Sequence, residues 1–276
     1  MPLPVDFQFS QNNLQDYLDC ARRFELRALR RLAWPAAQSE PVIEQERAIE
    51  RGSRFHHMLH QAVIGIPPTN LAEQCEDPFL QLWWQNYLTH PPQDLPKQRH
   101  PEFTLHAPFA GFRLIAKFDL IAIEPGRRAV IVDWKTAPHR PARSTLARRM
   151  QTRLYRFLLV EAGASLNQNM PIHPEQVQMI YWFANDPTAP EIFSYNEAEH
   201  KQINAELHQL IQEIQSLSDS GQPFPLTTHE KHCAFCTYRS LCGRGIQAGN
   251  WQDMEDEPEA ETPLQIDLEQ IGEIAF

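Results

Sequence analysis

The chain has 276 residues, of which 42% are hydrophobic, and a formal net charge of −10. This length and apolar content suffice for a sizeable folded core, in one large domain or two small ones. No stretch is apolar for long enough to cross a membrane, and the N-terminus lacks the basic and apolar regions of a signal peptide. We therefore expect a globular, cytoplasmic protein that does not associate with membranes.

The negative charge is unevenly distributed along the chain. Residues 253–276 contain nine acidic residues and no basic one, so the rest of the chain has 26 acidic against 25 basic residues. Residues 127–156, in contrast, contain nine Arg or Lys and a single acid. Such a basic segment suits a phosphate-rich substrate, although any single arginine in it is more often an ordinary exposed side chain. We expect a folded domain over residues 1–246 and an acidic, mostly disordered tail over residues 247–276.

The first part of the chain is predicted to be mainly helical. Ser10 is a suitable N-cap for a first helix, and Cys20 lies inside that helix. On a second helix, His56 and His60 share a face, but two histidines alone are weak evidence for a metal site. The predicted segments are a helix over residues 10–32, a helix over 44–64, a Pro-rich loop over 66–78, an aromatic helix over 79–88 and a loop over 89–101.

Strands dominate the middle of the chain. Alternating and apolar runs predict a meander of three strands over residues 102–107, 112–123 and 129–134. The Pro-Gly turn at residues 124–127 would pair the last two strands, and antiparallel pairing would bring Asp119 near Asp133. Lys135 follows Asp133 by two residues, so both side chains point to the same side of the strand.

Two carboxylates and an ammonium group at one place form a candidate centre for phosphodiester hydrolysis. Mg²⁺ or Mn²⁺ prefers oxygen ligands and needs few of them from the protein. The ion can activate a water molecule for in-line attack, and a lysine can stabilise the developing charge. A bare Asp-x-Lys is more often a plain salt bridge. Here Asp133 and Lys135 end a strand that is predicted to be buried, and Asp119 lies upstream at hairpin distance. This context makes the motif stronger evidence for a catalytic site than a bare Asp-x-Lys.

The remainder of the folded part alternates between helices and strands. We predict a helix over residues 144–162, strands over 177–184 and 191–195, and an amphipathic helix over 196–219 with Asn196 as its cap. On the first of these helices, Gln151 and Tyr155 are four residues apart and share a face with Arg148. The candidates for DNA contacts in this basic region are Arg140, Arg143 and Arg148.

Cys233, Cys236 and Cys242 form a compact group near the end of the folded part. Five cysteines in a reducing compartment indicate metal or cluster ligation rather than disulfides. Three cysteines do not complete a four-coordinate site, so a fourth ligand must come from elsewhere. The candidates for that ligand are Cys20, Cys75, His229 and His232. Spacing alone leaves zinc and a [4Fe–4S] cluster as close alternatives.

These motifs together resemble the PD-(D/E)XK nuclease superfamily and, within it, the RecB-like branch. The matching elements are Gly52–His56 for G-x-x-x-H, Asp119 with Asp133–Lys135 for the catalytic motif, and Gln151–Tyr155 for Q-x-x-x-Y. His57 does not fit the glycine spacing of the first element. Phe118 stands where the nominal signature has a proline, a departure that is frequent in this branch.

The resemblance implies a restriction-endonuclease-like α/β fold, in which a central mixed sheet is flanked by helices. It also implies a DNA nuclease that depends on Mg²⁺ or Mn²⁺. The implied roles are metal binding by His56, Asp119 and Asp133, orientation of the attacking water by Lys135, and DNA contact or support of the site by Gln151 and Tyr155.

The cysteines extend the resemblance to a subset of RecB-like nucleases, which includes AddB-type helicase-nucleases and CRISPR-associated iron–sulfur exonucleases. These proteins have one cysteine in an N-terminal helix and three after the nuclease core. Residues 10–24 match that helix, with Ala21 where a proline is usual. The resemblance implies a [4Fe–4S] cluster that joins the two ends of the domain, with zinc as the alternative. The implied ligands are Cys20, Cys233, Cys236 and Cys242.

The expected function is that of an exonuclease on single-stranded or end-bearing DNA in repair or recombination. The alternatives are a CRISPR-adaptation nuclease that processes spacer precursors, an RNA-directed or structure-specific nuclease, and a catalytically silent DNA-binding scaffold. The sequence contains no Walker A motif. A helicase, or a CRISPR or repair protein, would therefore act as a separate partner.

Overall fold

A computed structural model describes residues 2–33, 41–73, 75 and 77–246, so the expectations for the acidic tail lie outside the described residues. The strands are β1 (Gln8–Phe9), β2 (Gln98–Phe109), β3 (Phe112–Glu124), β4 (Arg128–Lys135), β5 (Val177–Phe183) and β6 (Asp186–Ser194). The α-helices are α1 (Gln11–Asp19), α2 (Ala21–Phe24), α3 (Pro41–Val63), α4 (Pro68–Ala72), α5 (Pro78–Thr89), α6 (Arg143–Arg148), α7 (Met150–Ala162) and α8 (Glu197–Asp219).

The centre of the molecule is a mixed sheet, as expected. Its strands follow the order β1-β3-β4-β5-β6, and β2 pairs with β3 as well. Strands β2, β3 and β4 form the predicted antiparallel meander, while β4 and β5 run parallel. The parallel pair requires a crossover connection, which α6 and α7 supply.

The hairpin between β3 and β4 has the predicted turn. Glu124 pairs with Arg128, and the Arg127 N–H donates to the Glu124 carbonyl oxygen at 2.9 Å. Gly126 has a φ of 73°, which fits the third position of a type II turn after a proline. The paired register ends at Leu120 opposite Val132, one residue after Asp119 on β3 and one residue before Asp133 on β4.

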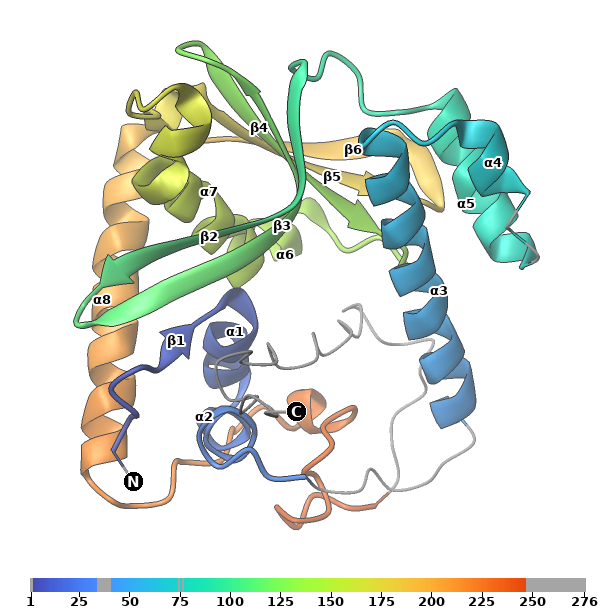
Figure 1. Ribbon diagram of the computed structural model, residues 1–276. Coiled ribbons are helices and arrows are strands. Elements are labelled where there is room, and N and C mark those ends of the chain that lie inside the picture. The colour runs from blue at the N-terminus through green and yellow to red at the C-terminus, as the bar shows by residue number, and fades with distance from the viewer. Residues whose placement is uncertain (1, 34–40, 74, 76, 247–276) are drawn as a thin grey trace, which may run out of the picture.

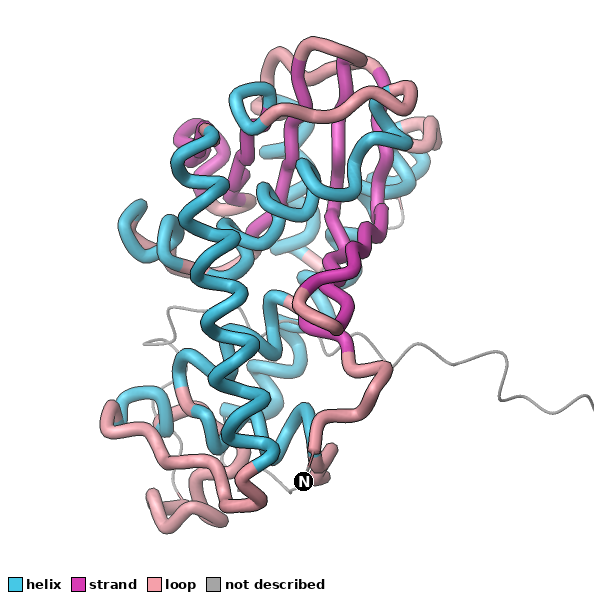
Figure 2. The backbone as a smooth tube through the Cα atoms, turned by 90° about the vertical axis from the view of Figure 1, so that its left-hand side faces the viewer, coloured by secondary structure: helices cyan, strands magenta, loops and turns pink. Residues whose placement is uncertain are grey.

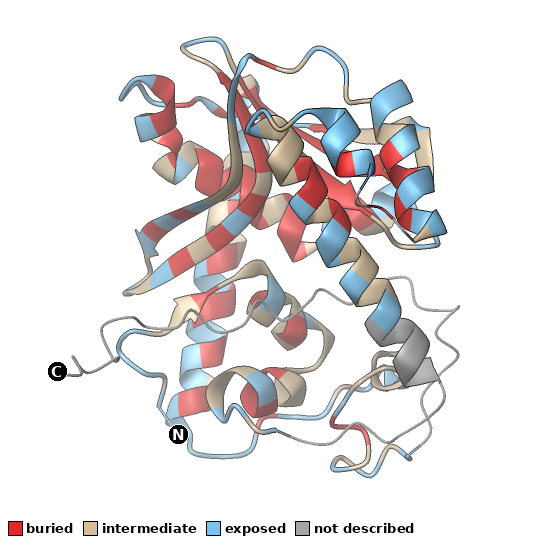
Figure 3. Cartoon of the chain, turned by 45° about the vertical axis from the view of Figure 1, so that its right-hand side comes forward, coloured by how far each residue is buried: buried red, intermediate tan, exposed pale blue. Residues whose placement is uncertain are grey.

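Helices cover both faces of this sheet with separate hydrophobic clusters (Figures 1 and 3). One cluster joins the sheet to α7 and α8 through side chains such as Phe157 and Ile211. The other joins it to α3, α4 and α5 through side chains such as Phe55 and Trp84. The sheet is therefore buried on both faces along β4 and β5, which explains why these strands read as nearly continuous apolar runs.

The β2–β3 ribbon changes direction near Asp119. Phe118 belongs to the cluster beneath α7, whereas Leu120 belongs to the cluster beneath α3, although residues two apart on a regular strand share a face. On the facing strand, Glu102 has a φ of 51°, a left-handed conformation that is uncommon for a residue with a side chain. Beyond this point the two strands form a long arm that extends toward β1 (Figure 1).

The two ends of the described chain lie together below the sheet (Figures 1 and 2). The Phe224 N–H donates to Glu25 Oε2 at 2.9 Å, and the Arg22 N–H donates to the Pro225 carbonyl oxygen at 3.1 Å. The rings of Phe24 and Phe224 stack with their centroids 6.0 Å apart. The segment after α8 is thus attached to the N-terminal helices.

The N-terminal helix differs from its prediction. Ser10 is the N-cap, as expected, and it exchanges two hydrogen bonds with Asn13. The predicted single helix over residues 10–32 is wrong, because Cys20 is extended (φ −163°, ψ 107°) between α1 and α2, and a π-helical turn follows over Glu25–Leu29. Cys20 therefore lies in a break of the helix rather than inside it.

Two further predictions need correction. The predicted loop over residues 66–78 contains the short helix α4. The predicted helix over residues 144–162 is divided into α6 and α7, because Arg149 adopts an extended conformation (φ −60°, ψ 140°). Among the helices that the structure describes, none has the length and apolar character that a membrane span requires.

Candidate active site

The first half of the site lies where α3 meets the bend of the β2–β3 ribbon. His56 Nδ1 is 3.3 Å from Asp119 Oδ1, and the Trp134 N–H donates to Asp119 Oδ2 at 2.9 Å. Gly52 lies one turn before His56 and faces Thr136. A Cβ atom at position 52 would lie only 3.0 Å from the Thr136 hydroxyl oxygen, which is closer than an ordinary contact. The glycine therefore lets α3 approach the end of β4, which brings His56 to the sheet.

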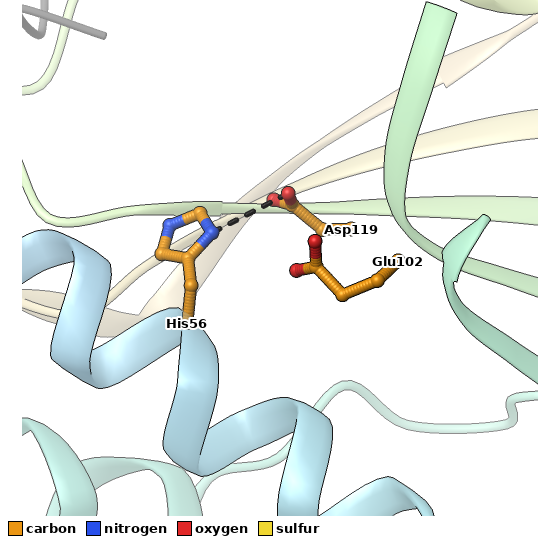
Figure 4. Close-up of side chains that lie close together, drawn as sticks. All are labelled: His56, Glu102 and Asp119. Carbon is orange, nitrogen blue, oxygen red and sulfur yellow. Dashed lines mark ion pairs between the residues drawn. The ribbon is translucent and has the colours of Figure 1, made fainter. Parts of the chain in front are cut away.

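Glu102 joins this pair, and sequence reasoning missed it. Single ligand atoms of His56, Glu102 and Asp119 all lie within 4.8 Å of one another, and Figure 4 shows the two carboxylates side by side and facing the imidazole. Glu102 stands opposite Asp119 in the register that pairs Pro101 with Leu120. Extending the hairpin register back from the turn at residues 110 and 111 would have found it.

The second half of the site is the buried end of β4. Lys135 Nζ is 2.9 Å from Asp133 Oδ2 and donates to Gln151 Oε1 at 3.1 Å. The Gln151 amide in turn donates to Asp133 Oδ1 at 2.7 Å. Asp133, Lys135 and Gln151 are at most 9% exposed. Asp133 and Lys135 thus lie on the same side of β4, as predicted, and contact each other directly. The Gln151 side chain on α7 hydrogen-bonds to both of them.

A layer of buried hydroxyl groups supports this end of the site. The Tyr181 hydroxyl on β5 lies 2.7 Å from Thr152 Oγ1 and donates to Gln151 Oε1 at 3.4 Å. The Tyr155 hydroxyl donates to the Lys117 carbonyl oxygen at 2.7 Å, which anchors β3 beside the bend. Tyr181 faces Asp133 through the parallel register of β4 and β5, a pairing that local sequence patterns do not reveal.

The two aspartates differ in electrostatic environment. Burial and the nearby Asp119 charge raise the pKa of Asp133 to about 7, although Lys135 acts in the opposite direction. For Asp119, burial would raise the pKa, but His56, the Trp134 N–H and Lys135 outweigh it and lower the pKa. A divalent cation between them would offset both the burial and the mutual repulsion.

The predicted DNA-contacting arginines lie in different surroundings. Arg140 and Arg143 both pair with Glu191 on β6, at 2.5 and 2.6 Å. Arg148 is exposed at the end of α6. The prediction that it shares a helix face with Gln151 and Tyr155 is wrong, because the helix is interrupted at Arg149.

The predicted cysteine ligands line one pocket, which lies beneath the sheet in the layer formed by the two chain ends. Cys20, Cys233, Cys236 and Cys242 all contribute to its lining, together with positively charged side chains such as Arg23. Burial and the neighbouring thiols raise the pKa of the three later cysteines. Cys75 lies elsewhere, buried against Met58 under α4 and α5.

Comparisons with known proteins agree with this architecture. A family model described as the PD-(D/E)XK nuclease superfamily matches residues 8–243. The chain belongs to the PD-(D/E)XK nuclease superfamily. Members of this superfamily are nucleases that hydrolyse phosphodiesters with divalent metals, and the match spans every element of the active site described above. A search of curated proteins gave no significant match.

Two solved structures are similar to this chain at low sequence identity. A candidate exonuclease from Eubacterium rectale is 9% identical, with a TM-score of 0.50 over 78% of this chain and 83% of that one. The protein SSO0001 is 14% identical, with a TM-score of 0.46 over 87% of both chains.

Proposed function

We propose that this protein is a metal-dependent deoxyribonuclease of the RecB-like branch, which acts as an exonuclease on single-stranded or end-bearing DNA in repair or recombination. One observation carries the proposal: Lys135 and Asp133 form a buried pair that Gln151 holds, and Asp119 with His56 lies opposite them on the hairpin. A chain without catalytic use for this pair would be expected to replace it, because burying two charges is costly.

His56 and Asp119 offer donor atoms that suit Mg²⁺ or Mn²⁺, whereas Asp133 does not belong to the group of described side chains whose ligand atoms all lie within 4.8 Å of one another. An ion at about 2.1 Å from each ligand keeps any two of its ligands within about 4.2 Å, and His56 and Asp119 already lie close to this spacing. Asp133 Oδ2 is buried, and among the described residues it meets the Lys135 ammonium without a well-directed hydrogen bond. We assign His56, Asp119 and Asp133 to the metal. The bound ion would supply a water of lowered pKa and neutralise charge on the phosphate.

The other residues position the reacting groups. Lys135 carries a positive charge at the buried end of β4 and would orient the attacking water and stabilise charge on the phosphate as it develops. Gln151 fixes the Lys135 ammonium through its oxygen and the Asp133 carboxylate through its amide. Tyr155 holds β3 and with it Asp119. We therefore assign the two Q-x-x-x-Y residues to support of the site.

DNA would lie across the exposed side of the centre. Arg148 is exposed and available for a phosphate contact. Arg140 and Arg143 would contact DNA only if they released the Glu191 carboxylate and bound a phosphate group instead.

The test is cleavage of DNA that carries a label at its 5′ or 3′ end, in the presence of Mg²⁺. We expect progressive shortening from one end by the wild-type protein and none by Asp119→Asn. Asp94→Asn is a matched control, because this carboxylate pairs with Arg128 on the surface, away from the site. Full activity of Asp119→Asn would contradict the proposal.

We further propose that the cysteine pocket holds a [4Fe–4S] cluster. Four cysteines line it, and arginines in the same lining would offset the charge of four thiolates. A tetrahedral zinc ion with Zn–S bonds of about 2.3 Å would hold its sulfurs about 3.8 Å apart. Among the described residues, no three cysteine sulfurs lie within 4.8 Å of one another. A single zinc ion would therefore require these sulfurs to move closer together.

The cluster proposal is tested on the purified protein. We expect a brown colour with absorption near about 400 nm and several iron atoms per chain. Stoichiometric zinc without iron would contradict it. As its partner we propose a separate helicase, or another repair or CRISPR protein, which would supply DNA ends to the nuclease.

A further inference from the structure

We propose that Glu102 is an additional ligand of the active-site metal, and that Lys117 is the counter-ion which it releases when the metal binds. The inference rests on the proposed function, because it assumes that a divalent cation occupies the centre. It adds a residue from β2 to a site that the sequence motifs confine to α3, β3 and β4.

The position of Glu102 supports a ligand role. Its carboxylate, the Asp119 carboxylate and the His56 imidazole offer three donor atoms within 4.8 Å of one another (Figure 4). Two ligands of one small cation lie at most about 4.2 Å apart, so side chains within the 4.8 Å limit need little movement to share an ion. Two oxygens and one nitrogen are also donors that Mn²⁺ accepts.

The backbone of Glu102 indicates that the placement has a cost. A φ of 51° within a strand is a conformation that glycine and asparagine adopt more readily than glutamate. The β2–β3 pairing continues on both sides of this residue, with Pro101 opposite Leu120 and Phe103 opposite Phe118. A glutamate at such a position is expected where its side chain has a use that compensates for the strain.

Lys117 and His56 are the positively charged or polar partners of the two adjacent carboxylates. The Lys117 ammonium lies 2.5 Å from Glu102 Oε2, while His56 pairs with Asp119. The Lys117 side chain is 51% exposed, so it can swing into solvent at little cost. A divalent cation would take over its charge-neutralising role at Glu102, and Lys117 and the metal therefore compete for the same carboxylate.

If Lys117 and the metal compete for Glu102, substitutions of Glu102 and of Lys117 should change the Mn²⁺ affinity in opposite directions. We measure Mn²⁺ binding to the full-length protein without DNA, by calorimetry and by the electron paramagnetic resonance signal of free Mn²⁺. Glu102→Gln should weaken Mn²⁺ binding by about tenfold, as expected for the loss of one charged ligand. Lys117→Met should tighten it severalfold. Unchanged affinity in both variants, or weaker binding by Lys117→Met, would overturn the proposal.

Controls separate this inference from the proposed function. Asp119→Asn should abolish Mn²⁺ binding, and Glu124→Gln, a half-buried glutamate paired with arginines at the tip of the next hairpin, should not change it. If Asp119→Asn weakens binding and Glu102→Gln does not, the inference fails and the metal centre stands. If Asp119→Asn has no effect, the proposed function fails as well.

A third variant tests whether Glu102 serves only the fold. Asn tolerates the left-handed backbone, so Glu102→Asn should raise the unfolding midpoint by about 2–4 °C while it weakens Mn²⁺ binding. A lower midpoint with unchanged Mn²⁺ affinity would show that the Lys117–Glu102 pair stabilises the ribbon and would overturn the ligand role.

Discussion

The active centre and the cysteine pocket differ in what holds their residues in place. The active-site side chains project from β3, β4, α3 and α7, and the strand pairing and two hydrophobic clusters fix them. The pocket cysteines lie in a helix break, a 3₁₀ turn and the irregular segment that follows it. Among the described contacts, hydrogen bonds such as that from the Tyr238 hydroxyl to the Leu32 carbonyl oxygen join the two ends.

From this difference we expect the proposed metal and the proposed cluster to act on the protein in opposite ways. The fold pre-organises the active centre, so the metal should add activity and little stability. The pocket brings distant segments together with little regular structure, so its bound group should add stability and no chemistry. The predictions that follow separate activity from stability at each site.

The largest effect is expected at Lys135. Lys135→Met removes the charge that we propose to stabilise the transition state, so the cleavage rate should fall roughly a thousandfold. Single-turnover cleavage of labelled DNA measures this loss. The unfolding midpoint should fall as well, because the substitution leaves the buried Asp133 carboxylate without its ion-pair partner, so the rates are compared at a temperature where both proteins are folded. A rate within a few-fold of wild type would remove Lys135 from the mechanism.

The next effect concerns stability rather than activity. Cys20→Ala should lower the free energy of unfolding by about 4 kcal/mol, the size expected for loss of a link across a long loop. In thermal unfolding this corresponds to a drop of about 10 °C. Cys75→Ala removes a buried sulfur outside the pocket and should cost about 1–2 kcal/mol. Equal losses in the two variants would count against a bound group in the pocket.

A smaller effect is expected where buried groups support the active centre. Tyr181→Phe removes the hydroxyl that bridges Thr152 and Gln151. We expect kcat to fall about tenfold through misplacement of Gln151 and Lys135, with KM little changed and a stability loss of about 1 kcal/mol. A change confined to stability would limit Tyr181 to a role in packing.

The smallest effect is a pH dependence in the layer beneath the sheet. Burial would raise the pKa of Glu25, but the Phe224 N–H, Arg22 and Arg30 outweigh it, so the pKa lies below its ordinary value of 4.5. The folded state therefore favours the carboxylate more than the unfolded chain does. The resulting stability is present above the ordinary value and is lost as the pH falls through the lowered pKa.

Thermal unfolding between about pH 5 and pH 3 measures this contribution. The midpoint of the wild type should fall more steeply with acid than that of Glu25→Gln, and the two curves should converge at low pH. Parallel curves would show that the attachment of Phe224 to Glu25 does not contribute to the acid sensitivity.

Much of the fold was predictable because its signals are local. Apolar alternation and the Pro-Gly turn located the β2–β4 meander and its antiparallel pairing, which extends to Leu120 and Val132 on the second hairpin. The caps at Ser10 and Asn196 were also predictable from side-chain chemistry. These features depend on residues near one another in the chain.

The features that were not predicted depend on tertiary contacts. The break at Cys20 and the break at Arg149 interrupt stretches whose composition favours continuous helix. Glu102 is the first residue of the predicted strand, and its importance follows from the bend of the ribbon rather than from its neighbours in sequence. Tyr181 enters the site through the parallel pairing of β4 and β5, which local periodicity does not specify.

The most direct test of the central claim is the metal dependence of DNA cleavage by the wild-type protein. Labelled single-stranded and duplex DNA are incubated with the protein in EDTA and then with increasing Mg²⁺ or Mn²⁺. The account predicts no cleavage in EDTA and a saturable rate that appears with the added ion. Cleavage that persists unchanged in EDTA, or intact DNA at every metal concentration, would contradict it.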